Sequence, residues 1–256
     1  MDSEERDAQF LQEALNLIKL GEERGIIFRL LGSIAVKLHS PEFVHLYKGM
    51  ERPLTDIDLM TYSRFRPLMR PFFTELGYRP RERLIASPAG RKRHIYVNDE
   101  KRWQVDIFFD ELDMCHKVNF RGRLELDYPT ITPTDILFEK MQIVKINPKD
   151  VKDTIILLRA HEVGHDEEDM INMDYVADVL SKDWGYYYTV TNNLKLVKDF
   201  LDEFDVLTDE DRKDVATKID TLLDAIESAP KTLKWKLRAK IGTKQKWYNE
   251  VEEVYL

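Results

Sequence analysis

The chain has 256 residues, a formal net charge of −8, an apolar content of 43% and one cysteine, Cys115. This size buries a full hydrophobic core in one or two domains, and a single cysteine excludes a disulfide within the chain and is typical of the reducing cytoplasm. The negative charge argues against a protein that coats nucleic acid by general electrostatic attraction. The acidic start lacks a signal-peptide pattern. The sequence contains no run of about 18 uncharged apolar residues, so no membrane span is predicted. We therefore expect a cytoplasmic protein without a membrane partner.

The first half of the chain alternates predicted helices and strands. An apolar stripe at helical spacing predicts a helix over residues 8–24, and Gly25 ends it. The apolar run 26–31 predicts a strand that leads into Gly32 and Ser33, and Ser33 can cap the helix that follows. Because a helix that begins after a glycine turn exposes unpaired N–H groups, this position is a natural phosphate cradle.

Two carboxylates, Asp56 and Asp58, lie two residues apart in the next predicted strand. Residues i and i+2 of a strand point to the same face, so these two side chains project together while their apolar neighbours face a core. Asp106 is the single polar residue inside another apolar run, 105–109. Two such charges about 4 Å apart repel each other by about 4 kcal/mol at an effective dielectric near 20. A cluster of this kind needs cations, and Mg²⁺ is the first candidate for a site made only of carboxylates.

The segments around these acidic strands give weaker signals. The residues 41–53 resemble an inserted loop, and a helix is expected near 64–76. Two strands or a hairpin are expected at 81–87 and 93–97. The three cations at 91–93 either form a polar hairpin turn or neutralise charge at the acidic site.

From Thr134 onwards the apolar pattern becomes helical. The expected helices begin at Thr134 and at Lys149 or Asp150, and cover residues 169–182, 194–206 and 209–228, the last with a capping box of Thr208 and Asp211. The sequence therefore predicts an α/β fold over residues 1–132 and a helical domain over residues 133–256.

A basic segment, 231–246, holds seven cations and no acid. With Trp235 inside it, this segment could grip RNA phosphates and stack on a base. The four-residue spacing of its apolar residues favours instead a solvated helix end whose Leu233, Leu237 and Ile241 pack inward.

The sequence His161-Glu-Val-Gly-His165 matches the H-E-x-x-H pattern of zinc peptidases. On a helix, the pattern places two imidazoles one turn apart and leaves Glu162 as the base. The metzincin extension and a well-placed third ligand are absent, and the acidic run after His165 is typical of a surface loop. We expect the two histidines at a helix C-terminus, where the helix dipole favours them, and a structural or adventitious metal site at His161 and His165 stays open.

Taken in order, Gly32-Ser33, Asp56-Ile-Asp58 and Asp106 resemble the signature of the DNA-polymerase-β-like nucleotidyltransferase superfamily. Within it, the chain is most similar to minimal single-chain members, which include AbiEii-type toxin nucleotidyltransferases and antibiotic nucleotidyltransferases. The resemblance covers about residues 10–160 and implies a mixed sheet flanked by helices, followed by a helical C-terminal half.

Further elements of the AbiEii-like pattern have counterparts in Arg52, which lies just before the acid pair, in Lys140 and in the stretch 149–153. The spacing between the Gly-Ser element and the acid pair is longer than usual because of the segment 41–53. That segment is expected to help shape the acceptor pocket.

The resemblance implies a nucleotidyltransferase that moves NMP from an NTP to a hydroxyl acceptor on RNA, protein or a small molecule, with two Mg²⁺ ions as cofactor. It also implies an antitoxin as a partner protein. The implied catalytic and metal-binding residues are Asp56, Asp58 and Asp106, and the implied nucleotide-binding residues are Gly32, Ser33, Arg52 and Lys140. Two alternatives remain: a zinc metallopeptidase built on 161–165, and a nucleotide-binding toxin–antitoxin-type module with little turnover.

Overall fold

The structure is a computed structural model that describes residues 3–251 and consists of two compact units. The first unit comprises the chain up to Leu38 together with Pro53–Leu112 and Val118–Ile131. The second comprises His39–Arg52, Asp113–Lys117 and the chain from Thr132 onwards. Whether residues 1–132 and 133–256 fold as separate domains stays a prediction.

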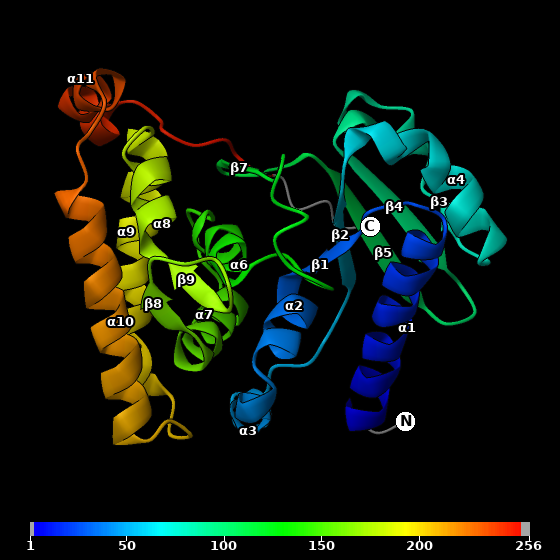
Figure 1. Ribbon diagram of the computed structural model, residues 1–256, viewed down its shortest axis with the longest axis horizontal. Helices are drawn as coiled ribbons and strands as arrows, with labels where there is room; N and C mark the ends of the chain where they lie inside the picture. Colours follow the sequence, from blue (N-terminus) through cyan, green and yellow to red (C-terminus); the bar gives the residue numbers. More distant parts are fainter. Residues whose placement is uncertain (1–2, 252–256) are drawn as a thin grey trace. The chain divides into compact units, whose positions relative to one another are not determined.

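Within residues 3–251, the first unit contains a mixed five-stranded sheet of order β1-β2-β5-β4-β3 (Figure 1). Its strands are β1 (Arg29–Leu31), β2 (Ile57–Thr61), β3 (Arg79–Pro80), β4 (Arg93–Asn98) and β5 (Trp103–Phe109). The central pair, β2 and β5, is parallel, and every other neighbouring pair is antiparallel. The mixed sheet that the sequence predicts is therefore confirmed.

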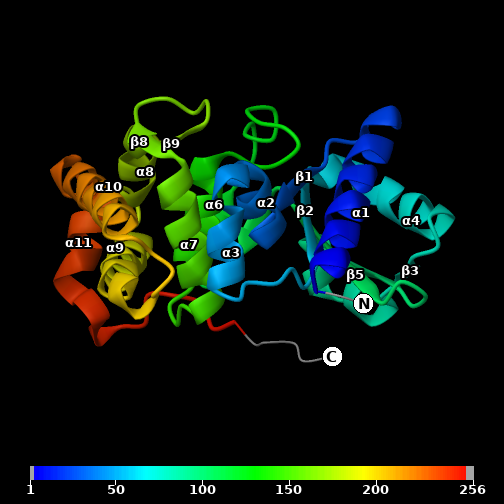
Figure 2. The same ribbon diagram turned by 90° about the horizontal axis from the view of Figure 1, so that it is seen from below.

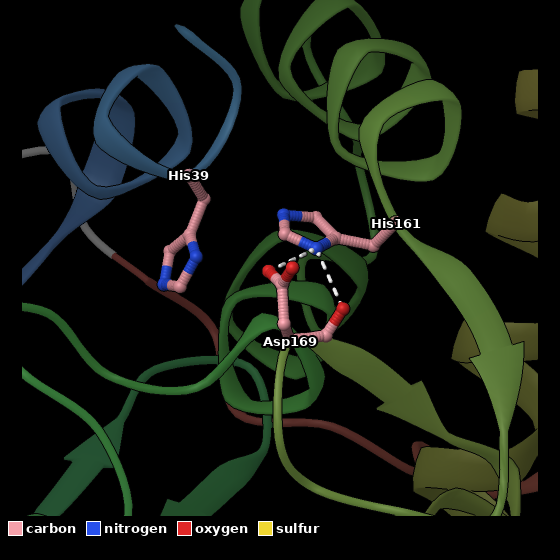
Figure 3. Close-up of side chains that lie close together, drawn as sticks. All are labelled: His39, His161 and Asp169. Atoms are coloured by element: carbon pink, nitrogen blue, oxygen red, sulfur yellow. Dashed lines mark hydrogen bonds and ion pairs between the residues drawn. The ribbon is translucent and has the colours of Figure 1, made fainter.

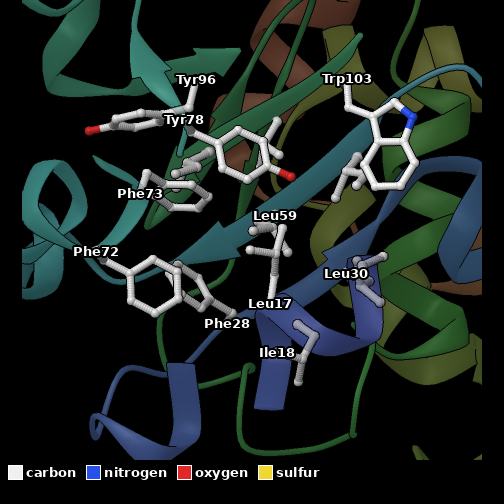
Figure 4. Packing of buried hydrophobic residues seen from close by; sticks show 14 of the residues in the cluster. Leu17, Ile18, Phe28, Leu30, Leu59, Phe72, Phe73, Tyr78, Tyr96 and Trp103 are labelled. Carbon is white, nitrogen blue, oxygen red and sulfur yellow. The ribbon is translucent and has the colours of Figure 1, made fainter. Parts of the chain in front are cut away.

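Two helices bury their apolar faces against one side of this sheet. They are α1 (Ser3–Glu23) and α4 (Arg66–Glu75), and Figure 4 shows Leu17 and Phe73 from them among the sheet residues. The sheet contributes alternate residues to the same core, for example Leu59 from β2. The other helical elements of the unit are α2 (Gly32–His39), whose last residue His39 belongs to the second unit, and α5 (Glu82–Ile85), η2 (Ser63–Phe65) and η3 (Pro88–Arg91).

The alternation of side chains along β2 and β5 determines which residues face away from this core. Ile57 and Leu59 of β2 belong to the core cluster, as do Val105 and Ile107 of β5. Because successive residues of a strand face opposite sides, the residues between them project from the other face of the sheet.

The second unit is mainly helical, and its longest helices pack on one another: α10 contacts α7, α8 and α9 (Figures 1 and 2). Its helices are α3 (Val44–Gly49), α6 (Pro133–Met141), α7 (Pro148–Ala160), α8 (Met173–Leu180), α9 (Trp184–Asp199), α10 (Asp209–Ser228) and α11 (Leu233–Ile241), with short helices η1 (Pro41–Phe43), η4 (Leu201–Glu203) and η5 (Gly242–Lys244). A pair of parallel strands, β8 (Glu162–Gly164) and β9 (Met170–Asn172), lies between α7 and α8 in the chain. The strands β6 (Glu111–Asp113) and β7 (Lys117–Asn119) lie where the chain passes between the units.

The helical C-terminal half is confirmed, and so is the capping box of Thr208 and Asp211 at the start of α10. The helix expected at Thr134 begins one residue earlier because Thr132 caps it and Pro133 takes its first position. No helix among residues 3–251 has the length and apolar character that a membrane span requires.

Several local predictions are wrong. Residues 41–53 contain helices η1 and α3, whose Leu46 and Tyr47 are buried, and are not an open loop. The segment expected as a strand at 81–87 forms α5. The helix expected over 194–206 begins earlier, at Trp184, and ends at Asp199, where the short helix η4 follows.

The helix α11 also differs from the expectation. Its residues Leu233, Leu237 and Ile241 are 73%, 55% and 43% exposed, so they do not pack inward. The indole of Trp235 lies against Tyr187 of α9, with ring centres 5.0 Å apart, so an aromatic contact attaches this helix to its unit.

Candidate functional site

The parallel pairing of β2 and β5 brings two of the predicted acids together. Asp58 and Asp106 are direct register partners, and both lie on the sheet face opposite the core of α1 and α4. Register partners on neighbouring strands have backbones about 4.8 Å apart, so the two side chains leave the sheet side by side. Asp56 lies just before β2 and accepts a hydrogen bond from Thr55 at 2.8 Å.

The Gly32-Ser33 element lies against the same acids. Leu31, the last residue of β1, is the register partner of Asp58 on the other side of β2. Gly32 follows with a φ of +73°, and a Cβ atom there would lie 2.7 Å from an Oδ atom of Asp58. Only glycine accommodates both this backbone conformation and this approach. Ser33, the second residue of α2, is 5% exposed.

Asp106 is 4% exposed and carries a partner of opposite charge. The guanidinium of Arg93 on β4 forms an ion pair with it, and the side-chain amide of Gln104 donates to it at 3.0 Å. Burial raises the pKa of the Asp106 carboxyl, Arg93 lowers it, and the negative charge of Asp56 raises it, with a net upward shift. This influence places the charge of Asp56 near Asp106 as well.

The raised pKa predicts that Asp106 destabilises the metal-free protein at neutral pH. A carboxyl whose pKa is higher folded than unfolded favours folding when protonated, and this contribution is lost as the pH rises through the folded-state pKa. Asp106→Asn should therefore raise the free energy of unfolding at pH 7 by about 1 kcal/mol. The gain should shrink towards pH 4, as the carboxyl takes up its proton in the folded state. Urea unfolding in a metal chelator at both pH values measures this difference.

Asp99→Asn is the matched control, because Asp99 belongs to the same unit, pairs with Arg79 at the surface and has a lowered pKa. The control should not stabilise the protein at pH 7. A loss of stability in Asp106→Asn at pH 7 would contradict the interpretation that repulsion and burial dominate at this carboxylate.

The two cations predicted to bind nucleotide, Arg52 and Lys140, occur together in the second unit. Arg52 makes a two-point ion pair with Asp153 of α7, with both N–O distances 2.8 Å. The ammonium of Lys140 lies 3.0 Å from Asp153 and 3.5 Å from Asp150. Asp153 is fully buried, and Arg52 and Lys140 are each about 6% exposed.

This buried ion cluster has strongly shifted protonation equilibria. Burial alone would lower the pKa of Lys140, but Glu139, Asp153 and Asp150 raise it well above its ordinary value, so the ammonium stays charged. For the carboxyl of Asp150, burial has the opposite effect and raises the pKa. The described contacts of these cations favour a structural role, in which Arg52 ties the segment 39–52 to α7. Nucleotide binding by Arg52 and Lys140 stays a prediction.

The H-E-x-x-H sequence does not form the helix that a zinc peptidase needs. His161 caps the end of α7 in an extended conformation, and β8 follows directly. His161 is buried and contacts Asp169, whereas His165 is 71% exposed and pairs with Asp174 at 2.8 Å. The two imidazoles are therefore not one helical turn apart, and the expectation of two histidines at a helix C-terminus holds for His161 only.

Sequence reasoning did not place the two side chains that contact Asp106: it missed Gln104 and did not single out Arg93. Gln104 lies two residues before Asp106 on β5, and strand alternation was the signal that could have placed it beside that carboxylate. Arg93 was one of three candidate cations, but nothing in the sequence reveals that β4 pairs with β5 in the register that brings it to Asp106.

Comparisons with known proteins add structural likenesses. No protein-family model and no curated protein matches the sequence. Among solved structures, the chain is similar to an antigenic nucleotidyltransferase-like protein from Paracoccidioides brasiliensis, at 13% identity and a TM-score of 0.38, over 91% of this chain and 96% of the other. It is also similar to the STING-associated CdnE c-di-GMP synthase from Capnocytophaga granulosa, at 10% identity and a TM-score of 0.30, over 88% of this chain and 82% of the other.

Proposed function

We propose that this protein is a Mg²⁺-dependent nucleotidyltransferase that moves NMP from an NTP to a hydroxyl group of RNA, protein or a small molecule. The observation that carries the proposal is the register pairing of Asp58 with Asp106 on the sheet face opposite the core, with Gly32 in contact range of Asp58. The proposal rests on these residues of the chain itself.

The residues fit a magnesium site in their chemistry. Three carboxylates supply the oxygen ligands that Mg²⁺ prefers, and their mutual repulsion is relieved when cations bind. Burial is the main cause of the raised pKa of Asp106, and the negative charge of Asp56 raises this pKa further. Arg93 supplies a positive charge at Asp106 in the metal-free protein.

The proposed roles follow from position. Asp56, Asp58 and Asp106 would hold two Mg²⁺ ions, which in such sites stabilise the triphosphate and lower the pKa of the attacking hydroxyl. The backbone amides at the start of α2, together with the Ser33 hydroxyl, bind the β- and γ-phosphates. Asp106 is the candidate base for the acceptor hydroxyl, since it would ligate the ion that binds this hydroxyl.

Arg93 is also a candidate for binding the nucleotide. Its Nε–H group is buried and has no hydrogen-bond acceptor among residues 3–251, although the guanidinium also pairs with Asp106. A buried donor without a partner is costly, and a phosphate oxygen would satisfy it. We therefore add Arg93 to the residues that bind the nucleotide.

Transfer of label from α-labelled NTPs tests the function. The protein is incubated with each of the four NTPs and Mg²⁺ in a lysate, and the label is then sought on RNA, protein and small solutes. Label in one acceptor class, dependent on Mg²⁺, is the expected result. Binding of Mg-NTP without transfer to any acceptor class would favour the nucleotide-binding toxin–antitoxin-type module with little turnover. An antitoxin-like partner protein would then be the next thing to seek.

A further inference from the structure

A second group of metal-ligating side chains lies in the second unit, apart from the carboxylates of β2 and β5. It consists of His39, the last residue of α2, His161, which follows α7, and Asp169, which precedes β9 (Figure 3). One ligand atom from each of the three residues lies within 4.8 Å of those from the other two. The two imidazole rings are 5.2 Å apart between centres and nearly perpendicular.

The two ring nitrogens of His161 differ in their surroundings: among residues 3–251, Nδ1 has hydrogen-bonding contacts and Nε2 has none. Its Nδ1 lies 3.0 Å from the main-chain carbonyl oxygen of Asp169 and 3.1 Å from the Asp169 carboxylate, as the dashed lines in Figure 3 show. The carbonyl can accept a hydrogen bond from Nδ1–H, which fixes the proton on Nδ1. The side chain is 2% exposed, and Nε2 has no hydrogen-bond partner among residues 3–251.

This arrangement is typical of a histidine prepared to bind a metal ion. Metal-binding histidines almost always donate their second ring N–H to a carbonyl or carboxylate, which orients the ring and leaves the other nitrogen as ligand. A buried imidazole nitrogen with no partner costs free energy unless something coordinates or donates to it. A bound cation at Nε2 would remove this cost.

We propose that His39, His161 and Asp169 form a Zn²⁺ site. Two imidazoles and a carboxylate suit this borderline ion, whereas three carboxylates suit Mg²⁺. Zinc–ligand bonds of about 2.0–2.1 Å place the ligand atoms of a tetrahedral site about 3.3 Å apart. Each of the three residues already offers a ligand atom within 4.8 Å of those of the other two, and rotations of the exposed Asp169 and the half-buried His39 side chains would bring their ligand atoms to Nε2 of His161. A fourth position remains for water.

The site would join His39 to a segment more than 120 residues later in the chain, which supplies both His161 and Asp169. His39 ends the helix that Gly32 begins, His161 ends α7, and Asp169 lies in the connection between β8 and β9. A zinc ion would therefore fix His39, the first residue of the segment 39–52, to two other segments of the second unit. This role is structural and does not depend on the proposed transfer reaction.

Zinc binding to the full-length, chelator-treated protein tests the proposal. ZnCl₂ alone is the probe, with stoichiometry measured by elemental analysis after gel filtration and affinity by competition with a chromophoric chelator. We expect one tightly bound Zn²⁺ per chain and a saturable rise in the melting temperature. His39→Asn and Asp169→Asn should each weaken binding at least about 100-fold, because even changes at outer partners of a metal site cost 10–100-fold.

His165→Ala is the matched control, because His165 belongs to the same H-E-x-x-H sequence but is exposed and pairs with Asp174. It should bind zinc as the wild type does. His39 and Asp169 are preferred over His161 for substitution, since the buried His161 also supports the fold. Failure of the wild type to retain one Zn²⁺, unchanged binding in both variants, or loss of binding in His165→Ala would overturn the proposal. None of these readouts depends on nucleotide transfer.

Discussion

Asp58→Asn is expected to lower the rate of NMP transfer by about 1000-fold, which corresponds to about 4 kcal/mol of transition-state stabilisation. The substitution keeps the shape of the side chain and removes its charge. Asp58 is the acid that links the other parts of the site, since Asp106 is its register partner on one side and Gly32 approaches its carboxylate on the other. The variant should also bind Mg-NTP more weakly. Steady-state transfer of labelled NMP and equilibrium binding measure the two effects.

The fold should survive this change, because Asp58 is not part of the hydrophobic core. Asp99→Asn again serves as the control of equal chemistry, and its activity should equal that of the wild type. Transfer by Asp58→Asn at a rate within tenfold of the wild type would remove this residue from the reaction.

Asp153→Asn is expected to lower the free energy of unfolding by about 3–5 kcal/mol, because removing one partner of a buried ion pair leaves the other charges uncompensated. Asp153 is fully buried and is the shared partner of Arg52 and Lys140. Neither cation can reach water without moving, since both are about 6% exposed. Urea unfolding at pH 7 measures the change.

The comparison variant is Asp178→Asn in α8, which removes an exposed ion pair with Lys182 one helical turn away. Exposed pairs of this kind contribute little, so its stability should remain within about 0.5 kcal/mol of the wild type. If Asp153→Asn loses no more than Asp178→Asn, the cluster of Arg52, Lys140 and Asp153 is not a stabilising element, and its cations would be available for another role.

The acidic site was the part of this molecule most accessible from sequence. Strand alternation predicts that Asp56 and Asp58 project together, and a single carboxylate inside an apolar run predicts a polar residue on one face of a buried strand. The register that makes Asp58 and Asp106 neighbours was not in the sequence pattern, because pairing depends on contacts between distant strands.

The errors have similar causes. The segment 41–53 has prolines near both ends and appeared to be a loop, yet Leu46 and Tyr47 bury enough surface to form α3 against the rest of its unit. The spacing of Leu233, Leu237 and Ile241 predicts one apolar face correctly, but periodicity does not reveal whether anything covers that face. The contact of His161 with Asp169 was not predictable either, because no pattern in the sequence connects the two residues.

A structure of the protein with Mg²⁺ and a non-hydrolysable NTP tests the central claim most directly. We predict two metal ions about 3.5–4 Å apart, bound at about 2.1 Å by oxygens of Asp56, Asp58 and Asp106. The triphosphate should lie against the amides that follow Gly32. Metal ions that bind without Asp106, or a triphosphate held elsewhere in the chain, would contradict the account.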